Sequence, residues 1–265
     1  MIAQQLLTRS LALRTLRKVP EITVYFWIIK LLSTAMGEST SDYLVFHINP
    51  YVAVALGGIG LIAALILQLV VRRYVASIYW FAVVMVAVFG TMAADVLHVV
   101  LGIPYLIATV FFAVVLALIF VAWYVSEKTL SIHSIDLLRR ELFYWATVMA
   151  TFALGTAAGD MTAATLGLGY LASGVLFTAL IAVPALGYWL FGLNEILAFW
   201  FAYIVTRPLG ASFADWFGKP YLGGLGLGDA KVSLVLTILI IGCVGYLTVT
   251  RQDITEEQPG QVNQR

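Results

Sequence analysis

The sequence predicts an all-α membrane protein with eight transmembrane helices, arranged as four two-helix repeats that enter the membrane in the same direction. Three observations support this fold class. Of the 265 residues, 62% are hydrophobic and only 11% are charged, with a mean hydropathy of +0.98, whereas a soluble domain is about 45–50% apolar and about 25% charged. Eight apolar runs are long enough to cross a bilayer. A tryptophan motif recurs four times along the chain.

Composition and motifs also exclude several classes of protein. The formal net charge of +1 leaves no excess of basic residues for binding nucleic acid. The single cysteine, Cys243, excludes a disulfide framework and any site built from several cysteine ligands. Because the sequence contains no HExxH, Walker A or Rossmann glycine motif, we expect no cofactor and no ATP-driven transport by this chain alone.

Each predicted helix is an apolar run of about 20 residues, the length that crosses the hydrocarbon core of a bilayer. The runs are rich in leucine, alanine, valine and isoleucine, and lipid tolerates no open sheet edges, so we predict helices rather than strands. The predicted helices cover residues 22–46, 51–71, 77–99, 103–125, 142–163, 168–191, 195–214 and 229–249.

The basic residues predict how the chain is oriented. Eleven of the fifteen lysines and arginines lie before the first helix, after the last helix, or in the loops that share this side. Since basic loops stay in the cytoplasm, we expect both termini there. Residues 1–18 mix leucine with arginine, which favours an amphipathic helix on the membrane surface, and residues 251–265 form a polar tail.

A tryptophan motif organises the chain into repeats. In each copy, an aromatic residue and a tryptophan are followed by a glycine ten residues after the tryptophan and by an aspartate fifteen residues after it. A polar linker, 126–141, separates repeats one and two (19–125) from repeats three and four (142–250). The repeated residues are Trp27, Trp80, Trp145 and Trp200, then Gly37, Gly90, Gly155 and Gly210, and then Asp42, Asp95, Asp160 and Asp215.

The motif is clearest in the stretches KVPEITVYFW (18–27), YWATVMATFALGTAAGD (144–160) and NEILAFWFAYIVTRPLGASFAD (194–215). In these stretches the chain resembles a family of bacterial membrane proteins described as four tandem copies of a two-helix repeat with a characteristic tryptophan. The resemblance covers about residues 18–250. It implies this fold and a multi-pass location in the bacterial inner membrane, and it carries no established activity.

The repeated tryptophans and glycines have structural interpretations. A tryptophan near the cytoplasmic end of a helix suits an anchor in the aromatic belt of the membrane, with gating or substrate stacking as the alternative. Each repeated glycine lies four residues before another small residue, and this spacing lets helices approach closely in lipid. We expect the glycines to pack the helices and so to hold the neighbouring aspartates in a fixed arrangement.

The four aspartates are the strongest functional signal. A carboxylate at the centre of a membrane helix costs roughly 2.5–3.5 kcal/mol, so four at one depth need a reason. They could cap helix ends, but we favour a ring of acids at the outer mouth of the bundle, which would attract cations. Lys30, Glu38 and Arg207 follow the same helix stripe as the aspartates, which indicates a polar path between the first helices of the repeats.

Other charged residues refine the expected site. Glu38 and Asp42 share a helix face, and two close carboxyl groups can share a proton or bind a divalent cation. Lys30 and Arg207 are expected to balance the acid charge. His98, within a turn of a ring aspartate, is a weaker candidate metal ligand. The candidate cation-binding residues are Glu38, Asp42, Asp95, Asp160 and Asp215.

These residues predict a secondary transporter or exporter of a cation, either a divalent metal ion or a cation moved with protons, and no enzyme. One alternative is an intramembrane aspartyl protease, because residues 226–229 read GLGD and resemble its GxGD element; Asp229 would then pair with Asp160 or Asp215. The other alternative is a membrane scaffold that transports nothing. The expected partners are the lipid bilayer and a small cation or small polar substrate, with a homo-oligomer left open.

Overall fold

The computed structural model describes residues 18–254, and most of them are helical. Seven of the described helices are long and apolar enough to cross a membrane. Helix α2, with 24 residues, is of similar length but carries the buried residues Lys30, Glu38 and Asp42. The helices are α2 (Val24–His47), α3 (Pro50–Val70), α4 (Ala76–Asp95), η1 (Val96–Val100), α5 (Tyr105–Glu127), η2 (Ile132–Ser134), α6 (Leu138–Asp160), η3 (Met161–Thr165), α7 (Gly169–Phe191), α8 (Glu195–Gly218) and α9 (Asp229–Thr250).

The all-α prediction is confirmed for the described residues, which contain no strand. The long helices begin and end within four residues of the predicted ranges when η1 and η3, which continue α4 and α6, are counted with them. The amphipathic helix predicted for residues 1–18 and nearly all of the polar tail predicted for 251–265 lie outside the described residues.

Capping residues determine where three of the long helices begin. The hydroxyl oxygen of Thr23 accepts a hydrogen bond from the backbone N–H of Phe26 in the first turn of α2. Asn49 caps α3, with Pro50 as the first helical residue, and Asn194 caps α8 through two backbone N–H groups. Because these caps define where α2, α3 and α8 start, residues at a given spacing along these three helices lie at a defined depth in the bundle.

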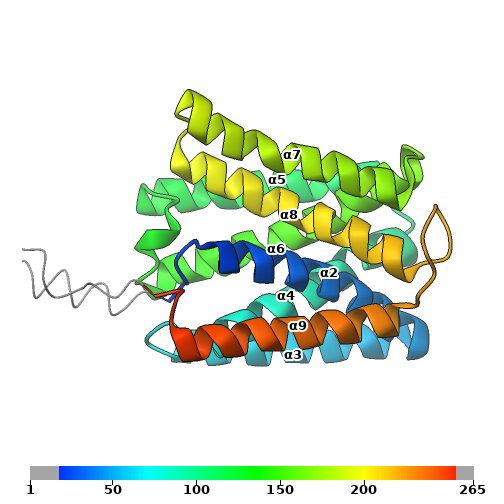
Figure 1. Ribbon diagram of the computed structural model, residues 1–265, viewed down its shortest axis with the longest axis horizontal. Coiled ribbons are helices and arrows are strands. Elements are labelled where there is room, and N and C mark those ends of the chain that lie inside the picture. Colours follow the sequence, from blue (N-terminus) through cyan, green and yellow to red (C-terminus); the bar gives the residue numbers. More distant parts are fainter. Residues whose placement is uncertain (1–17, 255–265) are drawn as a thin grey trace, which may run out of the picture.

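The long helices run side by side along the longest axis of the molecule (Figure 1), and the first helices of the repeats form a closed ring. We call α2, α4, α6 and α8 the inner helices; each packs against the one before and the one after it, and α8 packs against α2. The second helices, α3, α5, α7 and α9, are the outer helices. Each outer helix packs mainly on the inner helix of the following repeat: α3 on α4, α5 on α6, α7 on α8, and α9 back on α2. The last repeat therefore closes the ring by covering the first.

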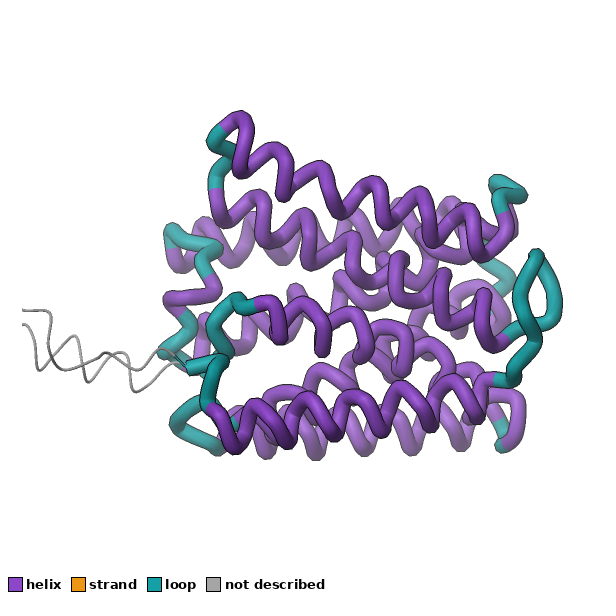
Figure 2. The backbone as a smooth tube through the Cα atoms, in the orientation of Figure 1, coloured by secondary structure: helices purple, strands orange, loops and turns teal. Residues whose placement is uncertain are grey.

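The loops lie at the two ends of the bundle (Figure 2). Both described ends of the chain lie at the same end, where the backbone N–H of Glu21 donates to the carbonyl oxygen of Asp253 at 3.0 Å. There Lys18 also pairs with the buried Glu141 at 2.6 Å, which joins the segment before α2 to α6. We call this the termini end and the opposite end the aspartate end, because the ring aspartates lie near the C-terminal ends of the inner helices.

The motif tryptophans lie near the termini end, and three of them are inside the protein. Trp80, Trp145 and Trp200 are at most 4% exposed, and Trp27 is partly buried. The ring of Trp145 lies 5.7 Å from that of Tyr79, between α6 and α4. A tryptophan of the aromatic belt would face the lipid headgroups, so this placement departs from the predicted anchor. Instead, these side chains fill the core between the inner helices.

The repeated glycines make the closest contacts between inner helices. Each packs against the residue that stands seven positions after the tryptophan on the next inner helix, and this contact recurs around the whole ring. A Cβ atom at any of the four glycines would collide with the facing residue. This is the close approach that the small-residue spacing predicts. The facing pairs are Gly37 and Ala87, Gly90 and Phe152, Gly155 and Arg207, and Gly210 and Thr34.

We expect Gly37→Ala to lower the thermal unfolding midpoint of the purified protein in detergent. The added methyl group would meet Ala87, including its backbone carbonyl carbon at 2.8 Å, and overpacking of this kind costs about 1–3 kcal/mol. Gly242→Ala in α9 is the matched control, because a Cβ there meets no other atom within 4 Å and alanine favours the helix by up to about 1 kcal/mol. Equal midpoints for the two variants would contradict this packing.

Candidate functional site

Arg207 lies at the centre of the ring of inner helices and is fully buried. Its Nη2 pairs with Oε2 of Glu38 at 2.6 Å. The same nitrogen donates to the hydroxyl of Thr156 at 2.6 Å and to the hydroxyl of Thr91. Its Nη1 donates to the backbone carbonyl oxygen of Thr34 at 3.2 Å. One guanidinium therefore joins α8 to α2, α4 and α6.

The three side chains that contact Arg207 occupy equivalent positions in their repeats. Glu38, Thr91 and Thr156 each stand eleven residues after the motif tryptophan, and Ala211 takes this place in α8. Equivalent positions of a ring of four similar repeats surround its central axis. The guanidinium of Arg207, which contacts all three side chains, therefore lies close to this axis, at the middle of α8.

Three carboxylates gather beside Arg207, toward the aspartate end. One oxygen atom from each of Glu38, Asp160 and Asp215 lies within 4.8 Å of the others, a spacing at which one metal ion could be held. We call these residues the carboxylate trio. Two of its members are predicted ring aspartates. Among residues 18–254, Asp42 and Asp95 do not belong to the trio, although Asp42 is linked to it through Lys219.

Lys219, directly after α8, belongs to the site, although the sequence analysis did not identify it. Its Nζ lies 2.8 Å from Oδ2 of Asp42 and 2.9 Å from Oδ1 of Asp215. Burial by itself lowers the pKa of Lys219, but the surrounding carboxylates, Asp215 first and then Asp42, Glu38 and Asp160, together outweigh it and raise the pKa well above the ordinary value. The ammonium therefore stays charged. Its spacing of four residues from Asp215 was the available signal.

Two of the ring aspartates lie where a helix changes its hydrogen bonding. The regular part of α4 ends at Asp95 and that of α6 ends at Asp160, and each helix continues as a short π segment, η1 or η3. In contrast, α2 and α8 continue as regular helix past Asp42 and Asp215. Asp95 and Asp160 stand at the N-cap positions of η1 and η3, but neither side chain makes a capping hydrogen bond. Short π segments inside helices are frequent at functional sites.

Lys30 is also buried among the inner helices. It stands three residues after the tryptophan of its repeat, whereas Arg207 stands seven residues after the tryptophan of its own repeat, so Lys30 lies about one turn nearer the termini end. Its Nζ has no hydrogen-bond partner in the described part of the chain. It lies 3.9 Å from the ring centroid of Phe152 and 4.1 Å from that of Tyr203. Aromatic faces attract a cation, and here they take the place of an acidic partner. Glu38 is thus paired with Arg207, and Lys30 lies between two aromatic rings instead.

Two weaker candidates lie outside the carboxylate trio. His98 lies in η1, where its Nδ1 is 2.9 Å from the carbonyl oxygen of Ile103 and its ring stacks on Tyr105. These contacts tie His98 to the turn that follows η1. Asp229 is the first residue of α9, and the glycine-rich backbone before it folds back on the end of α8.

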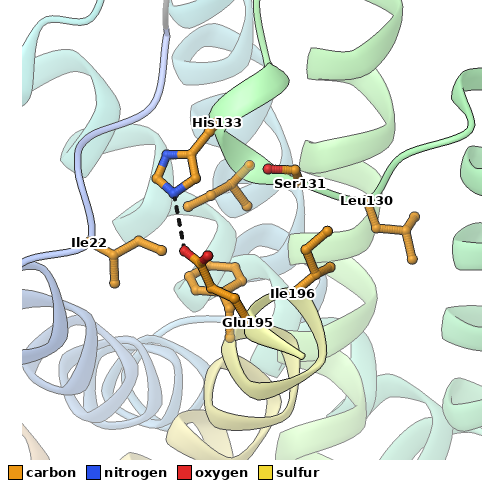
Figure 3. A pocket seen from close by; sticks show the side chains of 8 residues that line it. Ile22, Leu130, Ser131, His133, Glu195 and Ile196 are labelled. Atoms are coloured by element: carbon orange, nitrogen blue, oxygen red, sulfur yellow. Dashed lines mark ion pairs between the residues drawn. The ribbon is translucent and has the colours of Figure 1, made fainter. Parts of the chain in front are cut away.

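A separate pocket lies at the termini end (Figure 3). In it, the ring of His133 lies between two acids, with Nε2 at 3.7 Å from Glu195 and Nδ1 at 3.7 Å from Glu21. None of the predicted cation-binding residues lines this pocket. The lining residues are Ile22, Leu130, Ser131, Ile132, His133, Glu195, Ile196 and Phe199.

Comparison with known families accounts for the repeated architecture. The family model described as a repeat of unknown function, DUF347, matches the chain four times. The chain belongs to this family. The matches cover residues 25–74, 78–129, 143–192 and 198–253, so each starts two residues before a motif tryptophan and spans one inner helix and the outer helix after it. The prediction of four tandem repeats is thereby confirmed. No curated protein matches the chain, and no solved structure matches it.

We expect Arg207→Met to destabilise the protein strongly, because it leaves Glu38 buried without its cation, a loss that typically costs about 3–5 kcal/mol. The double variant Arg207→Met with Glu38→Gln should recover part of this loss. Thermal unfolding in detergent measures both changes. Arg139→Gln is the control, since the side chain of Arg139 is 63% exposed and such pairs contribute about 0–1 kcal/mol. Equal losses for Arg207→Met and Arg139→Gln would contradict the central role of Arg207.

Proposed function

We propose that this protein transports a small cation across the membrane, as a secondary transporter or exporter. The substrate we favour is a divalent metal ion or a cation whose movement is coupled to protons. The observation that carries the proposal is an excess of acid. Along the ring, from the motif tryptophans to Lys219, five carboxyl groups accompany three basic groups. The acids are Glu38, Asp42, Asp95, Asp160 and Asp215, and the bases are Lys30, Arg207 and Lys219.

The excess negative charge needs compensation for two physical reasons. Uncompensated charges within a membrane are costly. The ring aspartates also lie near the C-terminal ends of the inner helices, where the helix dipole is negative and favours cations. A bound cation or a bound proton would supply the missing positive charge. Divalent cations such as Mg²⁺ and Mn²⁺ prefer carboxylate oxygens, which the trio offers.

The proposed path runs between the inner helices. A cation that enters at the aspartate end would reach the trio and would meet Arg207 beyond it. Because the guanidinium is held by three inner helices, passage toward the termini end requires these contacts to rearrange. This is the behaviour expected of a transporter that opens to one side at a time, rather than of a permanently open pore.

We propose that all eight long helices cross the bacterial inner membrane and that the termini end faces the cytoplasm. Helix α2 is included because its charged residues are buried in the ring and so need not contact lipid. The predominance of lysine and arginine on the side of the termini supports this orientation.

We propose no enzymatic activity for the chain. An aspartyl mechanism requires two carboxyl groups that share a proton. Asp229 is not part of the carboxylate trio, and the glycines before it have a structural use at the end of α8. A scaffold without transport activity would not require the excess acid, and the experiment below separates it from a transporter.

We expect Asp160→Asn to reduce cation flux into liposomes that contain the purified protein. Loss of a single metal ligand should weaken binding on the order of tenfold or more, since even the residues that orient ligands contribute this much. Flux is measured with pH-sensitive and divalent-sensitive dyes across a panel of cations. Glu195→Gln is the matched control: it removes a carboxylate whose side chain is 67% exposed at the termini end, and it should retain wild-type flux.

Two outcomes would count against the proposal. Wild-type flux in a variant with asparagine at all four ring positions would show that the aspartates do not form the path. Absence of flux for every cation with the wild-type protein would favour a scaffold or a protease, and Asp229→Asn would then be the next variant to examine.

A further inference from the structure

Lys219 occupies a position that a cation would also favour. Its ammonium lies between Asp42 of α2 and Asp215 of α8, within 3 Å of each, and the side chain is only 12% exposed. Asp215 is at the same time a member of the carboxylate trio. One carboxylate is therefore shared between the ammonium of the protein and the site that we propose for the transported cation.

The loop after α8 holds the backbone of Lys219 in place. In the segment 219–228 the chain folds back along the last turn of the helix, so that the N–H groups of Leu225, Leu227 and Gly228 donate to carbonyl oxygens of residues 216, 217 and 218. These bonds satisfy carbonyls that a helix end leaves unpaired. The N–H of Gly226 donates to the carbonyl oxygen of Lys219 itself at 3.1 Å.

Glycine is required for this fold-back. Gly226 and Gly228 have φ values of +69° and +90°, in the left-handed region that residues with side chains rarely adopt. A Cβ at Gly224 would collide with the carbonyl oxygen of Lys219. The glycine-rich stretch that resembles a protease element thus anchors the backbone of Lys219. Because a lysine side chain is a flexible four-carbon stem, its ammonium can be displaced without any movement of this backbone.

We propose that Lys219 is a tethered competitor for the transported cation: its ammonium holds Asp215 and Asp42 when the site is empty, and an entering cation must displace it. The inference rests on the proposed function and adds a residue that sets affinity at the same site. A fixed positive charge beside the trio weakens the binding of a second positive charge. The same charge assists release, because it returns to the aspartates as the cation leaves.

The test compares Mn²⁺ binding by the full-length wild-type protein and by Lys219→Gln, both purified in detergent. Electron paramagnetic resonance of free Mn²⁺ gives the dissociation constant without any measurement of transport. We expect Lys219→Gln to bind Mn²⁺ about tenfold more tightly, a change of about 1.4 kcal/mol. Lys219→Arg keeps the charge and should bind Mn²⁺ about as weakly as the wild type.

Lys231→Gln is the matched control. It removes the same charge from an exposed position in the first turn of α9, at the same end of the bundle. Its dissociation constant should stay close to that of the wild type, because no carboxylate is paired with Lys231 in the described residues. Thermal unfolding of each variant establishes that it is folded.

The outcomes separate this inference from the proposed function. Unchanged or weaker Mn²⁺ binding by folded Lys219→Gln overturns the inference, as does an equal gain of affinity in Lys231→Gln, and wild-type cation flux would still support transport. Absence of Mn²⁺ binding in every variant also overturns it. If the wild type additionally shows no flux for any cation, the proposed function fails as well.

Discussion

A single buried guanidinium holds the inner helices together at mid-depth. Arg207 takes its partners from the three other inner helices, through a carboxylate, two hydroxyls and a backbone carbonyl. Burying such a charge costs several kcal/mol unless the partner groups are complete and well placed. Glu38, Thr91 and Thr156 reduce this cost by facing the axis, where they pair with Nη2 of Arg207. The depth of each inner helix relative to the others is tied to these contacts, and so is the position of the aspartates one turn further on.

Residues shared by all four repeats pack the inner helices together, and residues that differ between repeats place charged side chains at the central axis. The glycine that packs each inner helix on the next recurs in every repeat. The residue facing it is threonine, alanine, phenylalanine or arginine, depending on the repeat. Four identical repeats would place four like side chains around one axis, and four guanidinium groups there would repel one another. A central ion pair between Arg207 and Glu38 is possible only because the repeats have diverged at these positions.

The sequence predicts where the helices of this structure lie better than it predicts which helices pack against one another. Long apolar runs locate the helices, and the stripe that includes Lys30, Glu38 and Arg207 lies inside the ring. The hydrophobic pattern of the sequence does not show that each outer helix packs on the following repeat, because periodicity identifies the apolar face of a helix and not the helix that this face contacts. The spacing of Lys219 from Asp215 indicates one of its two ion pairs, but the pattern does not show the other, because Asp42 is distant in sequence. Nor does composition distinguish a tryptophan that faces lipid from one such as Trp80 in the core.

Two members of the carboxylate trio are each paired with a basic side chain. Glu38 is paired with Arg207, Asp215 is paired with Lys219, and Asp160 takes part in no ion pair among residues 18–254. A cation bound by all three carboxylates would draw negative charge away from both pairs at once and so weaken the hold on Arg207 and on Lys219. A ligand shifts a conformational equilibrium only through a difference in its affinity for the two states. Sharing Glu38 and Asp215 between the cation and the protein's own basic groups provides such a difference, so occupancy of the trio would favour states in which those groups have moved away.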